Sequence, residues 1–351
     1  MKLKFYGVRG STPVCEAGFQ QFGGNTTCFQ ITSTDTNRIA IIDAGTGLRN
    51  LGRDMRAIGH HQEELIIAFT HFHWDHLQGF PFFAPAYNPQ QKITILTLGR
   101  GQTVGNLREI FEVPLQSQYF PVQLDQMGAQ FEFLKVQDAS KHFTGVNDVE
   151  TKVTGQRHNH PGGAYGFRIE SNGKVLVICT DVEHGEKIDP NVVELSRGAD
   201  LLVHDAQYTA EELRTHRGWG HSSFDQAMQV AEMAGVKQLA MTHHDPEHDD
   251  EFLLRAMPAA IPQLASGPRR NGNRSLKSDC CRHGRACPPR RVRRPPRDFC
   301  STGEYLSVSG PDGAPLGVLV SERLFLRSLR IPHRASFEVS ASARMFPGVP
   351  R

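Results

Sequence analysis

Short apolar runs and amphipathic segments alternate along the first two thirds of the chain. Apolar runs of four to eight residues predict strands, and apolar residues spaced by three or four predict helices. Strands are predicted at 2–8, 29–32, 38–42, 64–70, 92–97, 129–136, 164–170, 174–180, 199–203 and 237–242, and helices at 48–55, 77–87 (short and broken early by prolines), 104–111, 191–197 and 224–234. This order indicates a mixed α/β (α+β) protein built on packed sheets.

The segment from Thr70 to Gly79 carries a dense group of metal-ligand side chains. His71 and His73 are two residues apart, so on an extended chain both imidazoles point to the same side. Asp75 and His76 follow at once, and a turn brings them round to face the same point. Imidazole and carboxylate groups are ligands for zinc, and a cluster with more ligands than one ion needs indicates two ions side by side. The His-x-His-x-Asp-His pattern after a buried strand therefore predicts a metal centre rather than a solvated polar turn.

Polar residues after two later strands extend this pattern. Asp181 ends the apolar run at 174–180, and a carboxylate in that place needs partners, because an unpaired buried charge is very costly. Two cations would supply them, so we interpret Asp181 as the carboxylate between both metals rather than as a loop cap. His243 follows the strand at 237–242 in the same way. Repeated delivery of ligands by strand ends argues for a single catalytic domain.

With its neighbours, the histidine segment resembles the metallo-β-lactamase superfamily of binuclear metallohydrolases. The segments Gly7–Pro13, Phe22–Thr26 and Asp43–Gly47 are similar to the branch that contains ribonuclease Z and cyclic phosphodiesterases. The resemblance covers about residues 1–257. It implies a four-layer αββα metallo-β-lactamase sandwich.

The resemblance also implies how the ions are held. His71, His73 and His160 match the ligands of one ion, Asp75, His76 and His243 match those of the other, and Asp181 matches the ligand of both. Spacing alone does not separate His158 from His160, but the Pro-Gly-Gly-Ala-Tyr-Gly that follows favours His160. The expected cofactor is two divalent metal ions, zinc first, with manganese or iron as alternatives.

A reaction and three catalytic residues are implied as well. A hydroxide bridging the ions would attack a phosphodiester, so no serine or cysteine nucleophile is required. Asp75 would also orient that nucleophile. His221 resembles the histidine that donates a proton to the leaving group, with Asp205 as its acidic partner where ribonuclease Z enzymes usually carry glutamate. Asp43 would support the metal-binding loop without ligating an ion.

The expected metal ligands and the pair of His221 and Asp205 together favour a phosphodiesterase over a thioesterase or lactamase of the same fold. They do not choose between a cyclic nucleotide, another small cyclic phosphate and RNA. No glycine-rich arm of the kind that ribonuclease Z uses for RNA is recognisable, and residues 1–257 hold 22 Lys and Arg against 31 Asp and Glu. An acidic body is a poor general surface for nucleic acid. A small or cyclic phosphodiester is therefore the expected substrate, with RNA, as a tRNA precursor, as the alternative partner.

Residues 258–351 have a different composition, with 17 Lys and Arg, 16 of them arginine, against 6 Asp and Glu. Such a segment buries too little apolar surface to offset its ordering entropy, which predicts a disordered basic tail after a hydrolase domain at 1–257. Nucleic-acid binding through the tail and an out-of-frame reading of GC-rich DNA are the alternatives. One hairpin is predicted, with strands at 305–307 and 317–321.

The remaining features call for no special role. No apolar run reaches the ~18–20 residues of a membrane span and the N-terminus lacks a signal peptide's apolar core, so we expect a soluble, cytoplasmic protein with no membrane partner. The sequence is compatible with a homo-oligomer. An aromatic loop at Tyr119–Val122 either lines a pocket or packs, and His244 is expected beside the ligands or facing solvent. The histidines assigned to the solvated surface are His60, His61, His142, His184, His216 and His248.

Overall fold

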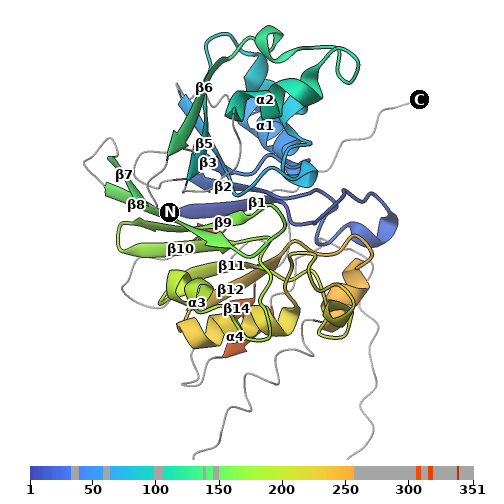
Figure 1. Ribbon diagram of the computed structural model, residues 1–351, viewed down its shortest axis with the longest axis vertical. Coiled ribbons are helices and arrows are strands. Elements are labelled where there is room, and N and C mark those ends of the chain that lie inside the picture. The colour runs from blue at the N-terminus through green and yellow to red at the C-terminus, as the bar shows by residue number, and fades with distance from the viewer. Residues whose placement is uncertain are drawn as a thin grey trace, which may run out of the picture.

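Two β-sheets lie against each other in the computed structural model, and helices cover their outer faces (Figure 1). The structure describes residues 1–32, 39–57, 64–98, 106–136, 140–144 and 150–256, and three short strands at 306–309, 315–318 and 338–339. The first sheet has the order β15-β1-β2-β3-β4-β5-β6 and the second the order β13-β14-β12-β11-β10-β9-β8-β7.

The bounds of the elements follow the predicted pattern closely. The first sheet contains β1 (Lys2–Gly7), β2 (Cys28–Thr32), β3 (Ile39–Ile42), β4 (Glu64–Phe69), β5 (Lys92–Leu98), β6 (Gln130–Val136) and β15 (Glu338–Val339). The second contains β7 (Ser140–Thr144), β8 (Glu150–His158), β9 (Ala164–Ser171), β10 (Lys174–Cys179), β11 (Leu201–Asp205), β12 (Gln238–Thr242), β13 (Leu306–Ser309) and β14 (Pro315–Val318). The α-helices are α1 (Gly47–Ala57), α2 (Leu107–Glu112), α3 (Pro190–Ser196) and α4 (Phe224–Ala234). Short 3₁₀ helices are η1 (Ala17–Phe19), η2 (Trp74–His76), η3 (Phe80–Phe82), η4 (Ala84–Tyr87), η5 (Val113–Leu115), η6 (Leu124–Gln126) and η7 (Glu212–Arg214).

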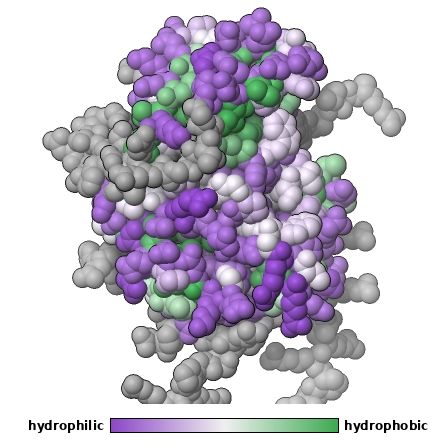
Figure 2. Space-filling model, viewed as in Figure 1, coloured by the Kyte–Doolittle hydropathy of each residue, from purple (hydrophilic) through white to green (hydrophobic). Residues whose placement is uncertain are grey.

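Three groups of buried apolar side chains join these layers. The central group takes residues from both sheets, such as Phe29 of β2 and Phe167 of β9. A second group packs α1 and α2 against the first sheet, and a third packs α3 and α4 against the second. The four-layer αββα architecture implied by the resemblance is therefore confirmed. In the view of Figure 1, Figure 2 shows a largely hydrophilic surface with hydrophobic residues visible mainly in the upper half, around α1, α2 and the neighbouring strands.

The helices form where their apolar residues share one face. In α1, Leu48, Leu51 and Met55 are buried, which is the spacing that turns one stripe of a helix toward a sheet. Helix α4 begins with a capping box, in which the Ser223 side chain accepts from the backbone N–H of Gln226 and the Gln226 side chain accepts from that of Ser223. Ser223 is therefore the cap of this helix.

Two predicted elements differ from the structure. The helix expected at 77–87 is replaced by η3 and η4, because Pro81 and Pro85 each stand in the first turn of a 3₁₀ helix and prevent a longer one. The sequence predicts that His160 ends a strand, but β8 ends at His158, so that His160 lies in the following turn. Among the residues that the structure describes, no helix has the length and apolar character to cross a membrane.

Parallel strands place the polar residues that follow them at one edge of each sheet. Strands β3, β4 and β5 run parallel in the first sheet, and β10, β11 and β12 run parallel in the second. Because carboxyl ends of parallel strands meet at the same edge, the residues after β3 and β4 are neighbours, as are those after β10, β11 and β12. Asp43, His71, Asp181 and His243 all stand in such positions.

The hairpin predicted within residues 258–351 is confirmed, because its two strands pair with each other. Strand β13 pairs antiparallel with β14, which pairs parallel with β12, while β15 pairs parallel with β1. The predictions that concern the rest of 258–351 lie outside the described residues. Both contacts with the sheets are short, since β14 and β15 each share two register pairs with their neighbours.

We propose that residues 1–257 form one domain, because three groups of buried apolar side chains within this range join both sheets to the helices that cover them. Truncation after Met257 is expected to leave folding and small-substrate hydrolysis intact. The melting temperature should fall by only a few degrees, since two short strand pairings are lost and ~1 kcal/mol shifts a domain of this size by about 2–4 °C. Thermal melts and rates of the full and short chains provide the comparison. Aggregation of the short chain would place the tail within the domain.

Candidate metal centre

The backbone is strained where several of the predicted polar residues leave their strands. Asp43, Asp181 and His243 adopt the left-handed conformation, with φ of 61°, 57° and 61°. Asp43 and His243 follow β3 and β12 directly, and Asp181 comes two residues after the end of β10. Such a conformation costs a non-glycine residue on the order of 1–3 kcal/mol. Strain of this kind persists where the surrounding contacts over-determine the geometry, which identifies the shared edge as a functional place.

His71, His73 and His160 form the first ligand group. One nitrogen of each ring lies within 4.8 Å of the others. His73 Nδ1 is 3.0 Å from His160 Nε2. Three imidazole nitrogens at such distances can surround one ion of the size and preference of zinc.

Asp75, His76 and His243 form the second group. Asp75 Oδ2 lies 3.2 Å from His243 Nε2 and 3.4 Å from His76 Nε2. The same carboxylate oxygen accepts the backbone N–H of Ser11 at 2.9 Å, which fixes its direction. Two imidazoles and one carboxylate thus face a second common point.

Asp181 stands between the two groups. Its Oδ1 lies 3.7 Å from His71 Nε2 and 3.1 Å from His243 Nε2, and its Oδ2 lies 3.3 Å from His76 Nε2. The side chain is buried and therefore has no access to bulk water that would solvate its charge. The seven predicted ligands are accordingly brought together in one place, with Asp181 shared between the two groups.

The donor set fits a pair of divalent ions. The Nε2 atoms of His71 and His76 are buried without a hydrogen-bond partner among the described residues, an arrangement that is costly unless another group engages them. The opposite nitrogen of each ring is engaged, with His71 Nδ1 next to Thr70 Oγ1 and His76 Nδ1 next to Asp43. These contacts direct both Nε2 lone pairs toward the shared centre, as metal-ligating histidines require.

Charge within the centre is balanced by burial and by the carboxylates. Burial lowers the pKa of His71 well below its ordinary value, which favours the neutral ring that metal binding requires. Burial opposes charge on His243 too, but Asp181 and Asp75 outweigh it and raise the pKa of His243 to about 9. Metal binding would displace protons held in this way.

Asp43 supports the metal-binding segment in the way that the resemblance implies. One of its oxygens accepts the Nδ1–H of His76 at 2.9 Å and the hydroxyl of Thr70 at 2.8 Å. The Thr70 hydroxyl oxygen in turn lies 3.2 Å from His71 Nδ1. One buried carboxylate therefore orients a histidine from each ligand group.

Replacement of Asp43 tests this support. Asn tolerates the left-handed backbone, so Asp43→Asn removes the charge while keeping the shape. We expect about 10- to 100-fold weaker metal affinity, the usual cost of losing a partner of a ligating histidine. Competition with a chromophoric chelator measures it. Asp54→Asn is the control, because Asp54 binds Lys4 and Tyr6 away from the centre; equal losses in both variants would refute a specific role of Asp43.

Two further partners of the ligands were not recognisable in the sequence. His160 donates from Nδ1 to the carbonyl oxygen of Gly220 at 2.8 Å, and His243 donates from Nδ1 to Gln207 Oε1 at 3.0 Å. A Cβ at Gly220 would lie 2.1 Å from His160 Nδ1, so only glycine permits this approach. Every residue has a backbone carbonyl group, so no residue type in the sequence predicts the contact with His160. The sequence does offer a signal for Gln207, which lies two residues after the predicted Asp205.

Asp205 and His221 form the predicted pair despite the shorter acidic side chain. Asp205 Oδ2 accepts from His221 Nδ1 at 2.9 Å, and Oδ1 accepts the backbone N–H of Ser222 at 2.9 Å. The ring of His221 stacks on His243 with centroids 4.8 Å apart. Asp205 therefore fixes His221 beside the second ligand group with its Nε2 free of the carboxylate.

His158 lies behind the centre instead of in it. It is buried, with neither ring nitrogen bonded among the described residues, and burial lowers its pKa to about 3. Gly166 makes room for it, since a Cβ there would lie 2.2 Å from His158 Nε2. The geometry thus favours His160 over His158 as the ligand.

Three histidines are more buried than predicted. His184 and His248, expected on the surface, are 3% and 4% exposed, and His244, expected beside the ligands or facing solvent, is 0% exposed. Their loops fold over aromatic neighbours, as shown by the stacking of His248 on Phe252 at 3.8 Å. His216 is half-buried and stacks on Tyr208. His60, His61 and the side chain of His142 lie outside the described residues.

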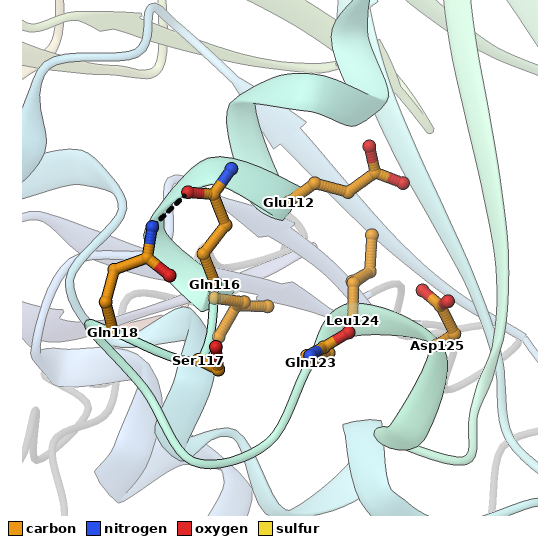
Figure 3. Close-up of a pocket in the computed structure, with 8 residues that line it drawn as sticks. Glu112, Gln116, Ser117, Gln118, Gln123, Leu124 and Asp125 are labelled. Carbon is orange, nitrogen blue, oxygen red and sulfur yellow. Dashed lines mark hydrogen bonds between the residues drawn. The ribbon is translucent and has the colours of Figure 1, made fainter.

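A separate hollow between α2 and η6 has no part in the centre. It is lined by Glu112, Leu115, Gln116, Ser117, Gln118, Gln123, Leu124 and Asp125, and the Gln118 amide donates to Gln116 on one side of it (Figure 3). None of these is a predicted ligand. The aromatic loop does not line this hollow either, because Phe120 packs on the core and against Phe82, and Tyr119 is exposed.

Comparison with known proteins agrees with this geometry. Ribonuclease Z of Haloarcula marismortui is 23% identical over 282 residues, which cover 69% of this chain and 86% of that protein. Ribonuclease Z of Brevibacillus brevis is 40% identical over 79 residues, but this match spans only 22% of this chain and 24% of the relative.

Solved structures show the same fold at low sequence identity. The metallo-β-lactamase fold protein YhfI from Bacillus subtilis superposes with a TM-score of 0.52 and 17% identity over 74% of this chain and 92% of its own. The short form of human tRNase Z has a TM-score of 0.50 and 18% identity, covering 70% and 94%. The family model described as a beta-lactamase superfamily domain matches residues 38–244, more than half of the sequence. The chain therefore belongs to the beta-lactamase superfamily and has the metallo-β-lactamase fold.

Proposed function

We propose that this protein is a binuclear metal-dependent hydrolase that cleaves a phosphodiester, and that its substrate is small or cyclic. The observation that carries the proposal is the Asp205–His221 pair beside the two ligand groups. A centre that only activates water needs no such pair, whereas a poor leaving group such as an alkoxide needs a proton from a positioned acid.

The ligand groups would hold the ions on either side of Asp181. When bound, two divalent ions would lower the pKa of the water between them and offset negative charge on the phosphoryl oxygens. Asp75 would have a second role besides binding an ion. Its Oδ2 is held by the Ser11 N–H at the second ligand group, so the carboxylate is positioned to orient the attacking water.

His221 would protonate the leaving group. Because Asp205 engages Nδ1, the exchangeable proton on Nε2 is directed away from the carboxylate. The ring lies between His243 and His160, with centroids 4.8 Å and 5.2 Å away, and thus next to both ligand groups. As the bond from phosphorus to the ester oxygen breaks, that oxygen takes the proton from Nε2.

Cleavage of tRNA precursors is the second candidate, and it is favoured by relatives that carry the name ribonuclease Z. The net charge of residues 1–257 weighs against it, with 22 basic residues against 31 acidic ones. Hydrolysis of a thioester or lactam would leave the Asp205–His221 pair without a clear task. Nucleic-acid binding through residues 258–351 is an independent, non-enzymatic alternative.

Turnover against a substrate panel tests the proposal. We expect hydrolysis of bis(p-nitrophenyl) phosphate and of cyclic nucleotides, with metal content measured on the same sample. Precursor tRNA with its native 3′ extension is the arm for the second candidate. Cleavage of that RNA and of no other substrate would favour tRNA precursors over small phosphodiesters. Hydrolysis of a thioester or lactam without hydrolysis of any phosphodiester would refute phosphodiester chemistry.

A further inference from the structure

The two tryptophans of this chain, Trp74 and Trp219, both lie beside the metal centre. They are 57% and 59% exposed, although Asp75, next to Trp74, and His221, two residues after Trp219, are buried. Tryptophan is a large apolar side chain that proteins usually bury to a high degree. Two exposed tryptophans at one centre therefore require a reason other than packing.

Each tryptophan is next in sequence to a residue that contacts the His160 ring. Trp74 follows His73, whose Nδ1 is 3.0 Å from His160 Nε2. Trp219 precedes Gly220, whose carbonyl oxygen accepts from the other nitrogen of the same ring at 2.8 Å. Both tryptophan-bearing segments therefore contact the His160 imidazole, which belongs to the first ligand group.

Trp219 is displayed on a fixed backbone. The Glu183 carboxylate accepts the N–H of Gly218 at 2.8 Å and the N–H of Gly220 at 2.8 Å, which clamps the residue between them. Both glycines have positive φ, at 86° and 94°, so this loop shape depends on them. Fixing an exposed aromatic ring in advance reduces the entropy lost when a ligand stacks on it.

The contacts that the Trp219 indole ring makes leave much of it exposed to solvent. The ring of Trp219 meets His216 edge to face, with centroids 4.7 Å apart and planes at 81°. His216 itself stacks on Tyr208 at 4.5 Å, which supports it from behind. An indole held along one side and open on the other is suited to a planar aromatic group of a ligand.

We propose that Trp219 and Trp74 form a stacking platform for the nucleobase of the substrate. This inference rests on the proposed function and narrows it, because a phosphodiester that carries a planar aromatic base is a nucleotide. Stacking on an aromatic side chain accepts every base, since each has a π face, so little discrimination among the bases is expected. Trp219, with its clamped backbone, is the stronger contributor.

The test compares two substrates that share the reacting bonds. One is a 3′,5′-cyclic nucleotide, and the other is methyl riboside 3′,5′-cyclic phosphate, which has no base. The wild-type protein should show a KM about tenfold to a hundredfold lower for the nucleotide, the range expected for one stacked base. Trp219→Ala should remove this difference through KM while leaving kcat within about twofold, and Trp74→Ala should remove part of it. Trp219→Phe should retain part of the preference.

A matched control separates stacking from general surface effects. Tyr119 is 69% exposed and lies in the loop between η5 and η6, so Tyr119→Ala should change neither KM. Equal KM values for the two substrates in the wild type, or equal losses on both in Trp219→Ala, would overturn the inference. The proposed function fails separately, if neither cyclic phosphate is hydrolysed by the metal-loaded protein.

Fluorescence supplies a readout that does not depend on turnover. Because Trp74 and Trp219 are the only tryptophans, their emission reports on the platform alone. A cyclic nucleotide with a non-hydrolysable phosphorothioate should quench the emission saturably, and the abasic analogue should not. Trp219→Phe should remove most of the quenching. Unchanged emission on saturation with the nucleotide analogue would refute stacking.

Discussion

Protein purified without chelator is expected to contain about two divalent metal ions per chain, because seven candidate ligands converge in two groups around Asp181. Their removal should abolish hydrolysis. Stabilisation of transition-state charge by such ions contributes several kcal/mol, which corresponds to roughly a thousandfold or more in rate. Elemental analysis before and after dialysis against a chelator, with rates at each stage and after zinc is restored, makes the measurement. One ion or none in a fully folded, active sample would exclude the binuclear centre.

Variants distinguish the two ligand groups. His160→Ala removes one nitrogen of the first group and should leave about one ion per chain, whereas Asp181→Ala should weaken both sites because its oxygens face both groups. His158→Asn is the comparison, since His158 lies two residues away, is buried, and belongs to none of the ligand groups. It should keep both ions, with any loss confined to stability. Loss of an ion from His158→Asn, but not from His160→Ala, would identify His158 and not His160 as the ligand.

The ligand residues were predictable because each carries its own local signal. Asp181 and His243 follow apolar strands directly, and His71 to His76 form one contiguous motif, so side-chain chemistry and position in the chain point the same way. The relative placement of these segments follows from parallel strands, whose ends meet at one edge. Patterning therefore predicted most of the elements and most of the candidate ligands, whereas the four-layer fold and the match of His160 to a ligand came from the resemblance.

Other features depend on contacts that a pattern does not encode. The carbonyl of Gly220 engages His160 across 60 positions of the chain, and no residue type announces a backbone acceptor. The left-handed backbone of Asp43 and Asp181 arises from the surrounding contacts, against the preference of the residue itself. The burial of His184 and His248 was missed for a related reason, since polar loops were taken to face water and these fold back onto the domain. Pairing of β14 with β12 likewise joins segments whose register no turn prescribes.

His221→Ala is expected to slow cleavage of a phosphodiester with an alkoxide leaving group by about 10²- to 10⁴-fold. The reason is the basicity of the leaving oxygen, which departs poorly without a proton from His221 Nε2. A p-nitrophenolate leaving group departs readily unprotonated, so bis(p-nitrophenyl) phosphate should lose much less. Asp205→Asn should reproduce part of the selective loss, because Asp205 holds the ring through Nδ1.

The comparison between leaving groups separates proton donation from a packing role. If His221 served only to pack against His243, its removal would disturb the ligand beneath it, and both substrates would lose activity together. His248→Ala is the matched control, because His248 also pairs with a carboxylate, that of Glu212 at 2.9 Å, but belongs to neither ligand group. It should leave the ratio of the two rates unchanged. Metal content must match the wild type in all variants, and equal losses on both leaving groups under that condition would remove His221 from the proton transfer.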